Sequence, residues 1–372
     1  MFAKKNLVAA AALLALVGAA QAQSSVKLYG YLEAGVGSYK AVGDTSAVTK
    51  VQSGDMMTSF IGFSGVEDLG GGLKAEFVLE SFIGVDSGSN VPNQAGQYWS
   101  RGSWVGLSGG FGKVALGQYD TPLFVAGLAY NPFGSSMTFS PTMRHFYNLG
   151  STSSKKTANT SQTDTGWVNS ITYETPVYAG FSGTLQFSPK ESPDKVDEET
   201  FSNSYTVGGS YNNGPLSVMA VYVDAGTSPA NGKVAGDDVF AYPTEFRATN
   251  LSASYDFGVV KAFGQYTRFK YYETKPLASS DSSVDPYLSG ITKSNVWQLG
   301  VSAPVSASGT VMASYGEAKF KAADGSAKSK ILSLGYDHAL SKRTSAYTAF
   351  TSEKLTGLES GRALAVGVKH TF

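Results

Sequence analysis

The carboxyl-terminal stretch Leu364-Ala-Val-Gly-Val-Lys-His-Thr-Phe372 alternates between two kinds of residue. Apolar or aromatic side chains occupy nearly every second position, and small or polar ones stand between them. A period of two is typical of a β-strand whose two faces meet different surroundings. The same pattern occurs in Phe181-Ser-Gly-Thr-Leu-Gln-Phe187. It recurs in sixteen segments, each of roughly ten residues, between Val26 and Phe372.

The links between these segments come in two lengths. Short links fall near residues 67–72, 108–112, 175–180, 211–215, 256–258, 303–309 and 338–343. Long links fall near 40–57, 83–99, 120–165, 188–203, 224–247, 270–294, 317–328 and 353–361. An even number of strands with short turns at one end and long loops at the other is typical of an outer-membrane barrel, because a bilayer tolerates no open sheet edge. The sequence therefore predicts an all-β fold, a 16-stranded antiparallel transmembrane β-barrel.

The first 22 residues differ from the rest of the chain. They combine the basic residues Lys4 and Lys5, an apolar run from Leu7 to Val17 and the small-x-small sequence Ala20-Gln21-Ala22. This order is typical of a cleaved secretory signal peptide. The apolar run is shorter than the ~20 residues that a membrane-spanning helix needs. We therefore expect a signal peptide at 1–22 and a barrel domain at 23–372.

The composition excludes several classes of protein. The chain of 372 residues has no cysteine, three histidines, and 29 basic against 29 acidic residues. It therefore holds no disulfide scaffold or cysteine-based metal site, and its balanced charge argues against a nucleic-acid partner. Acidic pairs such as Glu67-Asp68 and Asp237-Asp238 are interpreted as solvated turn and loop charges, with divalent-cation binding left open. We expect no cofactor and no bound metal.

One motif suggests an enzyme, and its surroundings argue against that interpretation. Residues 106–110 read Gly-Leu-Ser-Gly-Gly and fit the G-x-S-x-G pattern of serine hydrolases. That pattern needs a strand running into a helix, with acid and histidine partners downstream. Here another alternating segment, Lys113 to Gln118, follows, so we expect a glycine-rich hairpin and no catalysis. Only His145 lies where it could serve a hydrolase at the outer rim, and the sequence around it offers no partner.

Blocks of sequence along the whole mature chain resemble a known family. They include Leu28-Tyr29-Gly30-Tyr31, Glu67 to Ala75, Val105 to Gly112, Asn169-Ser170-Ile171, Leu340 to Thr344 and Gly367 to Phe372. In this order they resemble the trimeric general porins of Gram-negative outer membranes, of the betaproteobacterial type. The resemblance implies a homotrimer in the outer membrane, with lipid and lipopolysaccharide around it and a water-filled pore in each subunit. Small hydrophilic solutes and ions would diffuse passively through these pores.

The resemblance also implies particular functional segments. The long third loop, 120–165, would fold into the lumen and narrow it at mid-height. Phe372 would be the signal read by the outer-membrane assembly machinery. A solute-specific channel of the same fold, for a sugar, an organic anion or an aromatic compound, remains the leading alternative, and an outer-membrane hydrolase is a distant one.

Charged side chains at the constriction would set the ion preference, because a narrow passage lined by one sign of charge concentrates counter-ions. In the resembled family, basic side chains on the barrel wall face the third loop. The candidates here are Arg101 and Lys74 on the inward phase of their strands, with Ala75, Phe77 and Trp104 on the outward phase. Lys113 would lie nearer the periplasmic mouth, and Arg144 lies in the loop itself.

This chain departs from the family pattern at several of these positions. Phe60 and Gln118 stand where basic residues are usual, and Asp120 adds an acid beside the third loop. The pore is therefore predicted to be less positive than that of its relatives and only weakly charge-selective, with the sign left open. The aromatic residues Phe60, Tyr119, Tyr130 and Phe133 are interpreted mainly as packing for the third loop, the alternative being a track for sugars or aromatic solutes.

Overall fold

The computed structural model describes most of the chain. The described residues are 25–90, 98–147, 166–190, 202–226, 245–272, 291–322 and 325–372, with the backbone of a short pair at 195–196 and 199–200. The expected signal peptide at 1–22 and residues 148–165 of the third loop lie outside them. Among the described residues, no helix is both long and apolar enough to cross a membrane.

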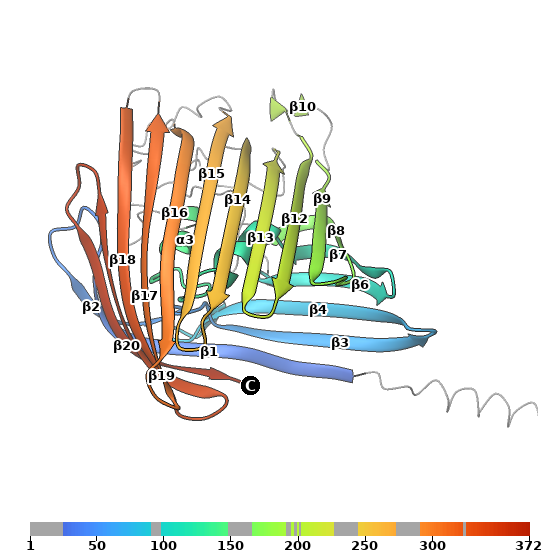
Figure 1. The fold of residues 1–372 in the computed structure, drawn as a ribbon, viewed down its shortest axis with the longest axis horizontal. Coiled ribbons are helices and arrows are strands. Elements are labelled where there is room, and N and C mark those ends of the chain that lie inside the picture. Colours follow the sequence, from blue (N-terminus) through green and yellow to red (C-terminus); the bar gives the residue numbers. More distant parts are fainter. Residues whose placement is uncertain are drawn as a thin grey trace, which may run out of the picture.

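Sixteen strands form a closed antiparallel barrel, as predicted (Figure 1). In chain order they are β1 (Ser25–Lys40), β3 (Phe60–Gly70), β4 (Leu73–Gly84), β6 (Gly102–Gly109), β7 (Gly112–Asp120), β8 (Gly166–Glu174), β9 (Phe181–Ser188), β12 (Ser204–Asn213), β13 (Leu216–Ala225), β14 (Glu245–Asp256), β15 (Lys261–Tyr272), β16 (Ile291–Pro304), β17 (Gly309–Ala322), β18 (Gly325–Ala339), β19 (Thr344–Leu355) and β20 (Gly361–Thr371). The ring closes where β20 pairs with β1, from Tyr31 opposite Thr371 to Lys40 opposite Arg362.

Two short strands extend the same sheet within the long links. β2 (Val48–Ser53) pairs with the second half of β1, while β3 pairs with its first half. β5 (Ser89–Asn90) pairs with the end of β4, and β10 (Lys195–Val196) pairs with β11 (Glu199–Thr200) in a separate small sheet. In Figure 1, β13 to β18 cross β1, β3 and β4 steeply, as tilted strands on opposite walls of a barrel do.

The long link between β7 and β8 carries two helices, α2 (Pro122–Ala129) and α3 (Pro141–Tyr147). α2 begins where the sequence provides a cap, because the Thr121 hydroxyl accepts a hydrogen bond from the Phe124 amide (3.2 Å) and proline follows the cap. α2 contacts β12, β13 and β14, and α3 contacts β16, β17 and β18. The face of the sheet on which these helices pack is called the inner face below, and the opposite one the outer face.

The two faces alternate along each strand in the way that the sequence predicts. On β14, Leu251 on the outer face is 58% exposed, and its neighbours Asn250 and Ser252 on the inner face are buried. Exposed aromatic residues gather near the short turns, at Phe111, Tyr178, Phe181 and Phe257, which is typical of an interfacial belt. Tyr29 does not belong to this belt, because it lies on the inner face, where its hydroxyl donates to Glu80 (2.5 Å).

All seven predicted short links are confirmed, and six of the eight long links lie where they were expected. The predicted long link at 317–328 is wrong, because β17 runs on to Ala322 and β18 starts at Gly325. The link at 353–361 contracts to residues 356–360. The lysine-rich sequence in this region looks like a loop, yet its charged side chains alternate with buried Ala318, Phe320 and Ala327 and so belong to strands.

Candidate functional site

Arg101 belongs to a cluster of charged and aromatic side chains on the inner face. Its guanidinium pairs with the Glu80 carboxylate and lies 4.2 Å from the centroid of the Phe60 ring. Tyr29 donates to the same carboxylate and packs edge-on against Phe60, with ring centroids 6.1 Å apart. The side chains of Arg101 and Glu80 are 21% and 10% exposed. The cluster thus presents a positive charge to solvent with its counter-charge beside it.

The strand register corrects one predicted phase. Ala75 and Phe77 lie on the outer face, opposite Leu107 and Val105, as expected. Trp104 was expected there too, but it lies on the inner face and packs against Tyr119, with ring centroids 5.2 Å apart. The predicted phase placed Arg101 within the strand and assigned Trp104 to the opposite face. Arg101 in fact lies just before β6, which begins at Gly102, so its orientation does not determine which face Trp104 occupies.

Lys113 forms a second cluster, nearer the short turns. Its ammonium nitrogen lies 2.8 Å from a carboxylate oxygen of Glu174 and about equally close to two rings, 5.2 Å from the centroid of Trp104 and 5.0 Å from that of Tyr119. Tyr119 donates to the other oxygen of Glu174 (2.7 Å). Like Arg101, Lys113 is therefore a wall cation with an adjacent carboxylate and an aromatic surface, an arrangement in which cation–π attraction adds to the ion pair.

The structure does not bring Lys74 to Arg101. Lys74 is the second residue of β4, exposed and opposite Asp68 of β3. Six residues separate it from Glu80, which is about 20 Å along an extended strand. Lys74 instead shares a row with Lys113, through Ser108 of the intervening strand.

Gln118 and Asp120 flank Tyr119 at the end of β7. Gln118 is buried, and its amide donates to the Ser100 carbonyl oxygen (2.9 Å), so it ties β7 to the chain before β6. Asp120 is partly buried, opposite Gly166 of β8. A bulge in β8 at Asn169, whose φ is 53°, turns Trp167 to the inner face, where it packs among the residues that cover α2.

Arg144 forms an ion pair that is sealed from solvent. Its guanidinium pairs with the Glu353 carboxylate of β19, and the two side chains are 2% and 1% exposed. The other oxygen of Glu353 accepts a hydrogen bond from the Ser329 hydroxyl (3.0 Å), which lies 3.0 Å from Nε2 of His145. No local pattern in the sequence indicates this group, because Glu353 lies 209 positions from Arg144. Burial favours an anchoring role for Arg144, and its role at a constriction stays a prediction.

His145 is not placed for hydrolysis. Burial, with the positive charge of Arg144 beside it, lowers the pKa of His145 to about 3, so the imidazole is neutral at physiological pH. Its partner Ser329 is fully buried. The G-x-S-x-G motif lies elsewhere, in β6, and runs through the Gly109 to Gly112 turn into β7, which confirms the predicted glycine-rich hairpin.

The segment from 121 to 147 is fixed to the barrel at several points besides Arg144. Thr138 donates to the Asp55 carboxylate (2.9 Å), and Thr142 donates to the Gln298 side chain through its amide (2.8 Å) and its hydroxyl (2.7 Å). Tyr130 and Phe133, 4% and 2% exposed, pack against strands. This confirms that these two aromatic residues serve as packing for the loop. Phe60 and Tyr119, interpreted in the same way, pack instead against Tyr29 and Trp104 of the wall.

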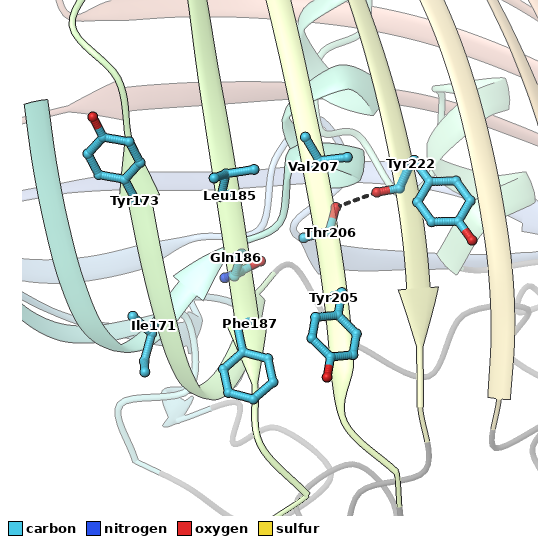
Figure 2. A pocket seen from close by; sticks show the side chains of 9 residues that line it. All are labelled: Ile171, Tyr173, Leu185, Gln186, Phe187, Tyr205, Thr206, Val207 and Tyr222. Carbon is cyan, nitrogen blue, oxygen red and sulfur yellow. Dashed lines mark hydrogen bonds between the residues drawn. The ribbon is translucent and has the colours of Figure 1, made fainter.

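The outer face carries an apolar hollow of about 350 Å³ across β8, β9, β12 and β13. Figure 2 shows Phe187 and Tyr205 standing side by side on adjacent strands, with ring centroids 5.1 Å apart. The polar residue Thr206 points to the other side of the sheet and donates to the Tyr222 carbonyl oxygen (3.0 Å). The hollow is part of the apolar outer wall of the barrel.

Phe372 completes the ring at the chain end. Its backbone exchanges two hydrogen bonds of 3.2 Å with Gly30 of β1. Its ring covers Gly30 on the outer face, where a Cβ would come within 2.6 Å of the phenyl ring. Glycine at position 30 is therefore what lets the terminal aromatic ring lie flat on the barrel wall.

Comparisons with known proteins agree with this architecture. A family model described as Gram-negative porin matches residues 9–358. An outer membrane porin protein of Bordetella pertussis is 32% identical over 412 residues, covering 99% of this chain and 100% of the relative. Outer membrane porin protein 32 of Delftia acidovorans is 34% identical over 397 residues, with the same coverage. The structure of an anion-selective porin from Comamonas acidovorans superposes with a TM-score of 0.70 at 27% identity, covering 94% of this chain and 100% of that chain. The chain therefore belongs to the Gram-negative porin family, and it is a porin of the outer membrane.

Proposed function

We propose that this porin is a passive, weakly charge-selective channel for small hydrophilic solutes and ions. In this proposal the inner face lines the water-filled lumen, and the segment from 121 to 147 narrows it. The observation that carries the weak selectivity is the pairing of wall cations with carboxylates on the same face. The three pairs are Arg101 with Glu80, Lys113 with Glu174 and, at 2.6 Å, Lys369 with Asp337.

Paired charges produce a weak field in a pore. A row of like charges attracts counter-ions along the whole passage, whereas a cation beside a carboxylate acts as a dipole whose potential falls off quickly. The Comamonas relative is described as anion-selective. Here Phe60 lies beneath the Arg101 guanidinium, and Gln118 is a buried tie between strands, so neither position supplies a cation to the lumen. We therefore infer a smaller preference for anions in this chain.

The reversal potential in a planar bilayer under a tenfold salt gradient tests this proposal. We expect the wild-type protein to give a value near zero, and Glu80→Gln to shift it toward anions by unmasking Arg101. Leu251→Ala, on the outer face of β14, is the matched control and should leave the potential unchanged. A strongly anion-selective wild type would refute the compensation argument, and absence of conductance would refute the channel.

A solute-specific channel is the second candidate, because Lys113 lies over Trp104 and Tyr119 on the inner face. Such a group suits an aromatic anion, through stacking and charge together. Saturable block of conductance by benzoate, lost in Trp104→Ala, would favour this candidate. We expect block that rises linearly with concentration, as in a general diffusion pore.

We also propose that the porin forms a homotrimer, with β1 to β8 at the subunit contacts, and that it catalyses no reaction. The outer face of these strands is apolar, with exposed Val26, Leu28, Val105, Leu107, Leu116 and Ile171. Lipid could cover this apolar face as well as a neighbouring subunit could. The mass of the detergent-solubilised protein distinguishes the two, because a homotrimer has three times the mass of one chain. Phe372 is proposed as the signal for the assembly machinery, and deletion of this residue should lower the amount of barrel in the outer membrane.

A further inference from the structure

The strand pairing along one side of β1 is interrupted between β3 and β2. β3 pairs with β1 as far as Tyr31, and β2 pairs with it from Ala34 onward. The two residues of β1 between these points stand opposite six residues of the neighbouring chain, 54–59. These six residues leave the sheet and are called the inward bulge below.

The sequence of the inward bulge explains its shape. Gly54 has a φ of 82°, a left-handed conformation that favours glycine, and there the chain turns out of the strand. At the other end the Ser59 hydroxyl accepts a hydrogen bond from the Glu33 amide (2.9 Å) and donates one to the Glu33 carbonyl oxygen (3.3 Å), in place of ladder bonds. Extra residues of this kind point side chains in a new direction. Here Asp55 and Met56 point into the barrel and are buried.

Asp55 connects three segments of the chain. Its carboxylate accepts hydrogen bonds from the Tyr39 hydroxyl of β1, from the Gln52 amide of β2 (2.7 Å) and from the Thr138 hydroxyl (2.9 Å). Its backbone carbonyl oxygen accepts another from the Ser136 hydroxyl (2.5 Å). A carboxylate has two oxygens and can accept several hydrogen bonds at once. A single residue therefore joins two strands of the wall to the turn between α2 and α3.

Apolar packing holds the same turn at the same place. Met56 of the inward bulge shares a buried cluster with Phe133 and Phe139, whose ring centroids lie 6.4 Å apart. The wall contributes small side chains to this cluster, so the turn can approach the strands closely. They are Ala349 of β19 and Ala363 and Ala365 of β20. Residues 131–140 are thus held by packing and by hydrogen bonds together.

A carboxylate at this position is unfavourable for stability alone. Asp55 is 0% exposed, and within the described part of the chain no lysine or arginine forms an ion pair with it. Lys50 instead lies over the Tyr39 ring, 5.0 Å from its centroid. Burying a charge without a counter-charge is costly. Directed hydrogen bonds give something that apolar packing does not, since they restrict the turn to one position.

We propose that the inward bulge gives the pore a single width, with Asp55 as its positioning residue. α2 and α3 have their own contacts with the barrel, at β12 to β14 and at β16 to β18. Ser136 and Thr138, in the turn between them, hydrogen-bond to the inward bulge. The inference rests on the proposed channel, in which residues 121–147 narrow the lumen. A turn released from the inward bulge would occupy several positions, so the pore would have several widths.

Single-channel recording with neutral polyethylene glycols of graded size tests this role. Polymers that enter the pore lower its conductance, so the size at which they are excluded measures its width. We expect Asp55→Ala to raise the open-channel current noise by about threefold or more and to broaden the size cut-off. The matched control is Asp86→Ala, an exposed aspartate whose carboxylate accepts from Ser53 (2.6 Å), and it should alter neither quantity. Wild-type noise and cut-off in Asp55→Ala would overturn the inference.

Two further variants distinguish positioning from a general loss of packing. Asp55→Asn keeps an acceptor oxygen in the same place, so it should remove at least half of the excess noise of Asp55→Ala. Equal noise in the two variants would contradict positioning through these hydrogen bonds. Thr138→Val removes the donor on the loop and should raise the noise by about twofold in the wild-type background but little in Asp55→Ala. Independent effects of the two substitutions would refute the contact as the cause.

The test remains decisive if Asp55→Ala does not assemble. Thr138→Val then stands alone, and unchanged noise in this variant would overturn the inference. Failure of the proposed channel has a different signature, because the wild-type protein would then show no conductance at all.

Discussion

Two arginine–glutamate pairs of the same chemistry lie on the inner face in different surroundings. Arg101 and Glu80 are 21% and 10% exposed, whereas Arg144 and Glu353 are 2% and 1% exposed. The first pair joins β4 to the residue that directly precedes β6, and the second joins the helix-bearing segment to β19. Exposure, and not residue type, therefore distinguishes the two pairs: we propose that the solvent-facing Arg101 acts on passing ions, whereas the buried Arg144 holds the loop.

The buried pair carries the larger energetic consequence. Removing water from two charges is costly, and removing one partner leaves the other uncompensated. The pair of Arg101 and Glu80 is partly exposed, so solvent screens it in part, and its loss should lower stability less than the loss of the buried pair.

Arg144→Ala should have the largest effect. It leaves the Glu353 carboxylate buried beside Ser329, and removing one member of a buried pair costs about 3–5 kcal/mol. We expect protease cleavage within residues 121–147 and a noisier, larger conductance, measured by limited proteolysis and single-channel recording. The double variant Arg144→Met/Glu353→Leu should restore most of the protection. A wild-type digestion pattern in Arg144→Ala would contradict the anchoring role.

Acid is expected to have the second-largest effect, because it destabilises the buried site around His145. The pKa of His145 is lowered from 6.5 to about 3 by burial, so its folded form binds fewer protons than its unfolded form. Above pH 6.5 the neutral imidazole costs the folded state nothing. As the pH falls from 6.5 toward 3, the free energy of unfolding decreases by about 1.4 kcal/mol per pH unit because of this group. Thermal unfolding at pH 7.5 and pH 4.5 measures the decrease in the free energy of unfolding between these two pH values. This decrease should be smaller by about 2–3 kcal/mol in His145→Gln than in the wild-type protein. Equal losses in both proteins would refute this assignment.

Arg101→Ala should alter selectivity more than stability. We expect the permeability ratio to shift toward cations by about two- to threefold, because Glu80 then faces the lumen without its partner. The pair is partly exposed, so the stability change should stay below about 1 kcal/mol. Reversal potentials and thermal unfolding of one preparation measure both quantities. A large loss of stability without a change in selectivity would contradict this prediction, because Arg101 and Glu80 would then serve mainly as a structural pair, like Arg144 and Glu353.

Lys113→Gln should have the smallest effect. The cation lies near the short turns, away from the helices, and its charge is already paired with Glu174. We expect a shift in permeability ratio below about 1.5-fold, in the same direction as for Arg101→Ala. A shift larger than that of Arg101→Ala would move the selective region to the Lys113 cluster.

Local patterns in the sequence predicted the barrel well. The period of two and the glycine-rich turns act over a few residues, so the strands and short links followed directly from them. The long link at 317–328 was predicted wrongly because of its lysines at 319, 321, 328 and 330. Charged residues on the outer face of a strand resemble those of a loop unless the buried residues that alternate with them are taken into account. The Arg144 and Glu353 pair had no local signal, since only the closed ring brings α3 to β19.

Closure at Gly30 and Phe372 has a consequence for biogenesis. The first and last strands of the barrel pair with each other, almost the whole length of the chain apart. Until the last strand pairs with the first, any partly assembled sheet has two unpaired edges, each able to pair with another chain. Such long-range pairing is slow compared with local hairpin formation. The polypeptide must therefore be kept from associating throughout its export, and a product shortened at its carboxyl end would reach the membrane with its seam open.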